Sequence, residues 1–261
     1  MFNGLRIGST GMKSSQHVMD NVADQIANSS TDGYKKKQVN FSELLRNEIG
    51  RNQVQVSENA AGSGISAGSK AIFSKTDFTQ GTVIPSAGNL HLAIEGRGFF
   101  GLVTSEGDLM LTRNGAFHQN ADHSITDDAG NLLGMEISVP LEDWPESAAV
   151  RVSQEGVATT RNAEGETVEL GRVILYLPEN SDELVSIGEG RYVQPDNLAL
   201  YNSADNPERG FGALRQNALE HSNVDTIQSM TDMIVTQRSY QMNAKSVTTA
   251  DDMLEVINTI I

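Results

Sequence analysis

One short pattern in this sequence matches a loop that binds dinucleotides in other proteins. Residues 96–101 read GRGFFG, which fits the pattern GxGxxG. Such a loop must be followed directly by a helix, because the free N–H groups of the helix N-terminus bind the pyrophosphate. The next residues, 102–107 (LVTSEG), are typical of a strand and a turn. We therefore interpret these glycines as a junction between two strands.

Two further patterns point to hydrolysis or metal binding. Residues 64–68 (GISAG) match the GxSxG motif of a nucleophile elbow, but they lie in a polar, glycine-rich segment and not between a buried strand and a helix. His118 and His123, with three aspartates nearby, lack metal-ligand spacing. A solvated loop is expected there, and a loose metal site is the alternative. We predict that the chain is not an enzyme and has no catalytic residue, cofactor or metal.

Composition excludes several partner classes. The 261 residues include 19 Lys and Arg against 34 Asp and Glu, a net charge of −15. This charge disfavours nucleic acid and anionic membrane surfaces, which both need a basic face. The sequence has no cysteine and no apolar stretch near the ~20 residues of a membrane span. The N-terminal residues lack the apolar core of a cleavable signal peptide. With 38% hydrophobic and 5% aromatic residues, the chain is expected to complete its burial against neighbours.

The C-terminal residues 222–261 contain neither Pro nor Gly and predict one long helix. Ser222 or Asn223 is expected to cap its first turn. Steps of three and four from Met230 produce a stripe in which seven of ten positions are apolar or aromatic, as expected for a helix that packs against another helix. A terminal helix packed on its own domain is the alternative. The stripe comprises Met230, Met233, Gln237, Tyr240, Ala244, Val247, Asp251, Leu254, Asn258 and Ile261.

The N-terminal residues 1–30 predict a second helix with the same spacing. Turn-forming residues end it at 28–33. Small residues at Gly8 and Ser15 would let a partner helix approach closely. We expect the two terminal helices to pair like a coiled coil, with their outward faces free to meet other copies. The stripe of this helix comprises Leu5, Gly8, Met12, Ser15, Met19, Val22 and Ile26.

Between the helices the apolar period changes to two, and turn residues recur every few positions. The dipeptide Asn114-Gly115 predicts a hairpin turn. Residues 52–69 are rich in Gly, Ser, Ala and Asn and predict an extended arm or loop. The expected fold is α+β, with a helical domain (1–30 and 222–261), a connecting region (31–89 and 201–221) and an antiparallel β domain (90–200).

The densest positive charge in this acidic chain is the run Lys35-Lys36-Lys37. One interpretation is a solvated turn. The other is a contact between subunits, in which these lysines meet the acidic surface of a neighbour.

Three motifs resemble the bacterial flagellar rod and hook protein family. The first is a helix that ends in Ala27-Asn28, followed by Gly33-Tyr34-Lys35 and by a Phe-x-x-Leu-Leu segment at 41–45. The second covers residues 93–100 (AIEGRGFF) and 112–117 (TRNGAF). The third is the C-terminal run, with Ser222-Asn223-Val224, residues 237–240 (QRSY) and residues 243–245 (NAK). The motifs occur in the family's order and reach both ends of the chain. The length and residues 52–69 best resemble distal rod members.

The resemblance implies a structural subunit that polymerises helically into a hollow shaft, which transmits torque and passes exported proteins. Helices would form the inner tube and the β domain the outer wall. Implied partners are further copies of the chain, proximal rod proteins, the hook protein, surrounding ring proteins and the flagellar type III export apparatus. The implied location is the basal body outside the cytoplasmic membrane, reached without a cleaved signal. Proximal rod and hook-type paralogues of the family, and a β-domain hydrolase or binding module, are the alternatives.

Overall fold

The computed structural model describes residues 2–44, 46–48, 64–66, 68–140, 144, 150–161, 166–195 and 198–260. The chain forms two compact units, which we describe separately. Unit 1 comprises Met1–Ala27, Lys37–Thr76 and Asp225–Ile261, and unit 2 comprises Asn28–Lys36 and Asp77–Val224. Both termini contribute to unit 1, and the fold class is α+β as predicted. None of the described helices is long and apolar enough to cross a membrane.

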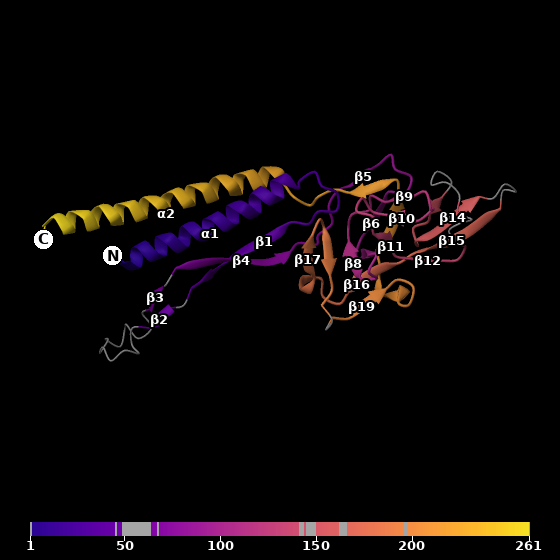
Figure 1. The fold of residues 1–261 in the computed structure, drawn as a ribbon, viewed down its shortest axis with the longest axis horizontal. Helices are drawn as coiled ribbons and strands as arrows, with labels where there is room; N and C mark the ends of the chain where they lie inside the picture. The colour runs from indigo at the N-terminus through magenta and orange to yellow at the C-terminus, as the bar shows by residue number, and fades with distance from the viewer. Residues whose placement is uncertain are drawn as a thin grey trace. The chain divides into compact units, whose positions relative to one another are not determined.

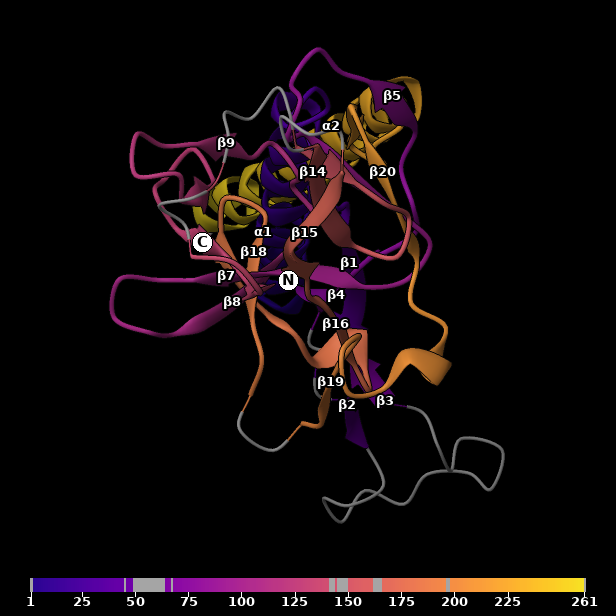
Figure 2. The ribbon, with the colours of Figure 1, turned by 90° about the vertical axis from the view of Figure 1, so that its right-hand side faces the viewer.

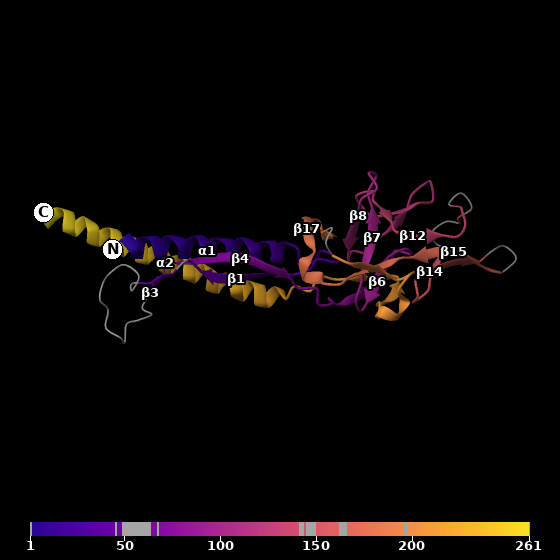
Figure 3. The same cartoon turned by 90° about the horizontal axis from the view of Figure 1, so that it is seen from below.

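Unit 1 contains both long helices, α1 (Phe2–Ala27) and α2 (Thr226–Ile260). They lie side by side and run in opposite directions, indigo and yellow in Figures 1 and 3. The backbone of Gly8 faces Val247, and that of Gly11 faces Asn243. The C-terminal turns of α2 extend past the first turn of α1 (Figures 1 and 3).

Two short antiparallel sheets complete unit 1. Strand β1 (Lys37–Glu43) pairs with β4 (Ser69–Thr76), and β2 (Arg46–Glu48) pairs with β3 (Gly64–Ser66). The β1–β4 pair is tied to α1 by side chains, because Ser14 Oγ donates to Ser69 O and Gln25 Nε2 donates to Lys37 O. This attachment divides the expected connecting region, since β1 and β4 belong to unit 1 whereas residues 201–221 belong to unit 2. Most of the expected arm at 52–69 lies outside the described residues.

The cap of α2 differs from the predicted one. Asp225 Oδ1 accepts hydrogen bonds from the backbone N–H groups of Ile227 and Gln228, at 2.9 and 3.0 Å, and α2 begins at Thr226. Asp225 is therefore the N-cap, and its charge is favourable beside the positive end of the helix dipole. The Oγ of Ser222 accepts from Val224 N–H, and the amide of Asn223 bonds within unit 2. The sequence has several capping residues in a row, and their types alone do not select among them.

Unit 2 is built from antiparallel strands, which confirms the predicted β character of the middle of the chain. Its largest sheet has the order β17-β18-β8-β7-β11-β10-β9, with β16 pairing β7 and β19. Figure 2 shows the β7–β8 hairpin of this sheet. Its strands are β7 (Phe99–Val103), β8 (Leu109–Thr112), β9 (His118–Gln119), β10 (Ile125–Thr126), β11 (Leu132–Leu133), β16 (Leu175–Pro178), β17 (Val185–Gly188), β18 (Arg191–Val193) and β19 (Leu200–Asn202).

Smaller antiparallel sheets accompany this large one. A four-stranded sheet has the order β12-β15-β14-β13, β20 pairs with β6, and β21 pairs with β5. In the described part of unit 2, the 3₁₀ helices η5 (Ser181–Glu183) and η6 (Pro207–Arg209) lie in the connections. The strands are β5 (Val83–Pro85), β6 (Leu92–Glu95), β12 (Met135–Ile137), β13 (Arg151–Val152), β14 (Val157–Arg161), β15 (Thr167–Val173), β20 (Ala213–Gln216) and β21 (Ala218–Glu220).

The core of unit 2 forms between these sheets. Phe100 and Phe117 pack edge to face with ring centroids 5.1 Å apart, and both are buried. A second cluster joins Phe78, Phe99 and Tyr192, whose centroids are 5.1–6.2 Å apart. Edge-to-face pairs contribute beyond simple burial, by ~0.5–1.5 kcal/mol each.

Two glycine-containing segments test the predicted turns. Gly96 and Gly98 have φ angles of 118° and 134° and connect β6 to β7, which confirms that residues 96–101 are a strand junction. The hairpin predicted at Asn114-Gly115 is wrong, because β8 pairs with β7 and β18. Gly115 instead packs on β6, where an added Cβ would lie 1.6 Å from Leu92 O. Close backbone approach, and not hairpin geometry, requires this glycine.

Candidate functional site

The described residues offer little for catalysis. They contain no group of three His, Cys, Asp or Glu side chains placed to hold a metal. His118 Nδ1 lies 3.6 Å from Asp128, and His123 Nδ1 lies 3.3 Å from Gln119 Nε2. A half-open hollow of about 460 Å³ in unit 2 is lined partly by Glu155, Arg172 and Ser203, but by no histidine. Its lining therefore contains no serine–histidine pair for nucleophilic attack.

The helix pair shows where the predicted stripe residues lie. Val22 is 5% exposed, and Ser229 on α2 is 1% exposed. The half-buried members of the two stripes are Leu5, Met12, Met19, Ile26, Met233, Tyr240, Ala244, Val247 and Leu254. Met230 differs, because it is 51% exposed. Ile261 lies outside the described residues.

A regular row of residues on α2 explains why Met230 does not belong to the half-buried face of this helix. Large residues recur every seven positions at Met233, Tyr240, Val247 and Leu254, and small or polar residues alternate with them at Ser229, Thr236, Asn243 and Ala250. These positions repeat at steps of four and three and share one helix face. All of them are half-buried or buried. The row begins at Ser229, one residue before Met230, so Met230 lies outside this face and is exposed.

Close contact between the helices depends on glycine in α1. An added Cβ at Gly8 would lie 2.7 Å from Val247 Cγ2, and one at Gly11 would lie 2.8 Å from Asn243 Nδ2. Both distances are too short for real carbon atoms. The close approach predicted at Gly8 is thereby confirmed.

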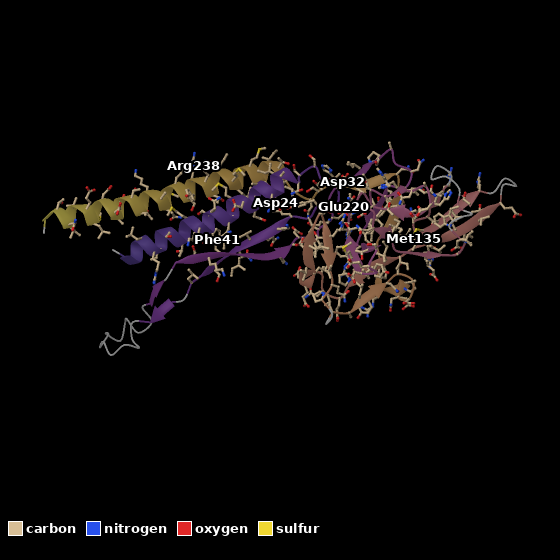
Figure 4. The ribbon with its side chains drawn as sticks, viewed as in Figure 1. Asp24, Asp32, Phe41, Met135, Glu220 and Arg238 are labelled. Carbon is tan, nitrogen blue, oxygen red and sulfur yellow. The ribbon has the colours of Figure 1, made fainter. Side chains whose placement is uncertain are left out.

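The opposite side of α2 exposes apolar side chains, and we call this surface the outer face of α2. Ile227 is 79% exposed, Ile234 55% and Met242 65%. Arg238 projects from α2 on the side away from α1 (Figure 4), so a charged residue interrupts the apolar surface. An isolated apolar residue on a surface is ordinary, but several apolar residues along the exposed side of one helix are typical of an interaction site. The apolar residues of this face are Ile227, Met230, Ile234, Val235, Met242, Met253, Val256 and Ile257.

Lys35 is not the surface cation that the sequence suggested. It is 1% exposed, and its Nζ donates to Glu220 Oε1 at 2.5 Å and to Thr79 O at 2.8 Å. The prediction of an inter-subunit contact is therefore wrong for Lys35, because its ammonium is bonded inside unit 2. Lys36 and Lys37 are half-buried, and Lys37 Nζ lies 3.6 Å from Asp24. A contact through these two lysines stays a prediction.

Glu220 joins two buried cations. Its Oε2 accepts from Arg113 NH1 at 3.2 Å, and its Oε1 also accepts from Gly81 N–H at 2.8 Å. Arg113 donates further to Gly96 O and lies over the Phe99 ring at 5.3 Å. Figure 4 places Glu220 among the strands of unit 2. Sequence reasoning missed this cluster, since a carboxylate in a short apolar strand was the only available signal.

Two buried cations share the Glu220 carboxylate, and Asp77 attracts Lys35 more weakly. Burial lowers the pKa of Lys35 below its ordinary value, and the neighbouring Glu220 carboxylate opposes that shift. Burial also lowers the pKa of Arg113, again against the attraction of Glu220. Removing charges from water is costly, so each bond to Glu220 offsets part of the desolvation penalty.

Comparisons with known proteins identify the family. Residues 215–260 match the family model described as flagellar basal body rod FlgEFG protein C-terminal, and residues 93–160 match the flagellar hook protein FlgE/F/G D1 domain. The flagellar basal-body rod protein FlgG of Bacillus subtilis is 33% identical over 275 residues, covering 99% of both chains. The chain belongs to the flagellar basal-body rod protein family, FlgG type. The rod protein FlgG of Agrobacterium fabrum is 30% identical and covers 97% of both chains.

These matches agree with the motifs found in the sequence. The second motif lies inside the matched D1 domain, and the third lies inside the matched C-terminal region. A related protein of B. subtilis, the flagellar hook-basal body complex protein FlhP, is 27% identical over the whole of both chains. The chain is thus a structural subunit of the flagellar rod.

Proposed function

We propose that copies of this chain polymerise helically into the distal part of the rod, a hollow shaft that transmits torque and passes exported proteins. The exposed outer face of α2 is the observation that supports this proposal. Eight large apolar side chains on it are between 39% and 79% exposed, and Ile227 is the most exposed of them. Burying such a face against other copies favours association by about 25 cal/mol per Å² of apolar surface, before the entropic cost of association is subtracted.

The proposal includes the partners and the route of the protein. Copies of the chain are its main partners, with proximal rod proteins and the hook protein at the two ends of the polymer and ring proteins around it. The flagellar type III export apparatus would deliver the chain across the cytoplasmic membrane without a cleaved signal. Paired terminal helices, packed like a coiled coil, would form the inner tube. The chain would have no catalytic activity.

The test replaces one apolar residue of the outer face with a charge. Ile234→Asp would place an unpaired carboxylate in the buried contact, which opposes association strongly. We expect the concentration needed for polymerisation to rise at least ~10-fold, which corresponds to ~1.4 kcal/mol per contact. Sedimentation and light scattering of the purified chain measure this concentration.

The matched control is Gln237→Asp, an exposed polar position on the same helix. It introduces the same charge without removing an apolar side chain, so we expect a change of less than about twofold. Polymerisation of Ile234→Asp at the wild-type concentration would show that the outer face of α2 is not the assembly surface.

The similarity to FlhP supports one other candidate, a hook-basal body paralogue with a different place along the structure. Expression of the chain in strains that each lack one rod or hook protein distinguishes these functions. Restored motility only in the strain without its FlgG protein supports the distal rod.

A further inference from the structure

One amide side chain, that of Asn223, connects three separate segments of unit 2. Its Oδ1 accepts from the backbone N–H of Lys36 at 2.8 Å. Its Nδ2 donates to Asp77 O at 2.8 Å and to Thr79 O at 3.1 Å. Lys36 and Asp77 are also joined directly, because Asp77 N–H donates to Lys36 O at 2.8 Å.

These segments occur at notable places along the chain. Lys36, Asp77 and Val224 are the residues of unit 2 at which the chain continues into or arrives from unit 1. The chain passes between the units at four places. Asn223 directly precedes Val224 and bonds Lys36 and Asp77, so its hydrogen bonds connect three of these four places. The passage after Ala27 is the exception.

The residue type follows from this bonding pattern. An amide has both an acceptor and two donors, whereas a carboxylate only accepts and an aliphatic side chain does neither. Asp at this position would retain the bond from Lys36 N–H but would bring a negative charge beside two carbonyl oxygens. Helix capping does not explain the choice, because Asp225 performs that role.

The Glu220 cluster joins the same three segments by further hydrogen bonds. Lys35 bonds both Glu220 and Thr79 O, and Gly81 N–H donates to Glu220 Oε1. Gly33 N–H donates to Glu220 O at 2.7 Å. Segments 33–36, 77–81 and 220–223 therefore form a hydrogen-bonded node, in which Lys35 and Asn223 both donate to Thr79 O.

We infer that Asn223 is a positioning residue for rod assembly, because it holds together the three segments of unit 2 at which the chain passes to or from unit 1. This inference rests on the proposed polymerisation. A polymer repeats one subunit geometry many times. If these three segments were held less firmly, every contact between subunits would therefore be weakened, although unit 2 itself would stay folded. Asn223 shares the Thr79 carbonyl with Lys35 of the Glu220 cluster, but its side chain carries no charge and buries no apolar group.

Two measurements on the monomer test the node independently of polymerisation. In Asn223→Ala we expect hydrogen exchange at the backbone N–H groups of Lys36 and Asp77 to accelerate by about tenfold, because both lose support. The thermal unfolding of unit 2 should not change. It can be followed by the fluorescence of Trp144, the single tryptophan of the chain, which is 3% exposed.

Assembly is the functional readout. We expect Asn223→Ala and Asn223→Asp to raise the concentration needed for polymerisation by ~10-fold or more. Asn180→Ala is the matched control, since Asn180 is an exposed asparagine of unit 2 whose side chain bonds Asp182 and Glu183 in its own turn. This control should polymerise like the wild type.

Three results would overturn the inference. They are unchanged exchange at Lys36 and Asp77, wild-type polymerisation of both Asn223 variants, and early unfolding of unit 2, which would make Asn223 an ordinary structural residue. Failure of the proposed function has a different signature, because Ile234→Asp would then polymerise normally while exchange in Asn223→Ala was still accelerated.

Discussion

Glu220 supplies one negative charge to two buried cations, Lys35 and Arg113. Loss of the carboxylate and loss of one cation should therefore have unequal effects. Glu220→Gln removes the carboxylate that bonds both cations and leaves Lys35 only the weaker attraction of Asp77, so we expect a loss of ~3–5 kcal/mol in the free energy of unfolding. Lys35→Met leaves a balanced pair of Arg113 and Glu220, so we expect only the ~1.5–3 kcal/mol of a lost charged hydrogen bond.

Denaturant unfolding followed by Trp144 fluorescence measures both changes. Equal losses in the two variants would show that Arg113 does not compensate Glu220. A greater loss in Lys35→Met would contradict the charge balance described above.

Tyr192 provides a pH dependence at the same scale. It is 2% exposed, and burial raises the pKa of its hydroxyl to about 12 from 10.0. The folded state therefore binds this proton more tightly than the unfolded state. The resulting stability is fully present below pH 10 and is lost as the pH rises towards about 12, by at most ~2.7 kcal/mol.

The measurement compares the free energy of unfolding of the wild type and Tyr192→Phe between these pH values. We expect the wild type to lose more stability than the variant over this interval. Parallel curves would mean that the Tyr192 hydroxyl ionises like a free tyrosine.

At the scale of elements, the contact between α1 and α2 depends on where a methyl group fits. Gly4→Ala adds a methyl with no other atom within 4 Å, so the better helix propensity of alanine should raise stability by up to ~1 kcal/mol. Gly8→Ala adds the same methyl at 2.7 Å from Val247 Cγ2. We expect the clash to cancel this gain, so that Gly8→Ala is less stable than Gly4→Ala.

Far-ultraviolet circular dichroism during thermal unfolding reports the helices of both variants. If Gly8→Ala were as stable as Gly4→Ala, α1 and α2 would not approach closely at Gly8 in solution.

The sequence predicted elements whose signals are local. Both helices were predicted from the three-four spacing of their apolar residues. The strand junction at Gly96 was predicted because the residues after the glycines are typical of a strand and not of a helix. Features that depend on distant residues were not predictable. Lys35 appeared as a surface charge because its partner Glu220 lies 185 residues away. Ser222, Asn223 and Asp225 are all suitable capping residues by type, so the sequence did not show that Asp225 is the N-cap. Asn114-Gly115 resembles a hairpin turn, yet contact with β6 determines its conformation.

At the scale of the whole molecule, the structure places large apolar side chains both between α1 and α2 and on the outer face of α2. The first set explains how the single chain holds its terminal helices together. The second set is largely exposed in the described chain, and this exposure is consistent with the rod family to which the chain belongs. The central claim is that assembly buries this outer face.

Labelling of a single cysteine tests that claim most directly, because the natural chain contains no cysteine. Ile234→Cys replaces an apolar residue of the outer face with a smaller, nearly apolar one, and Thr236→Cys marks the half-buried face towards α1 as a control. Reaction with a maleimide is followed in the monomer and in the polymer. We predict that Cys at position 234 reacts readily in the monomer and at least ~10-fold more slowly in the polymer, while position 236 is slow in both. Equal rates at position 234 in monomer and polymer would contradict the account.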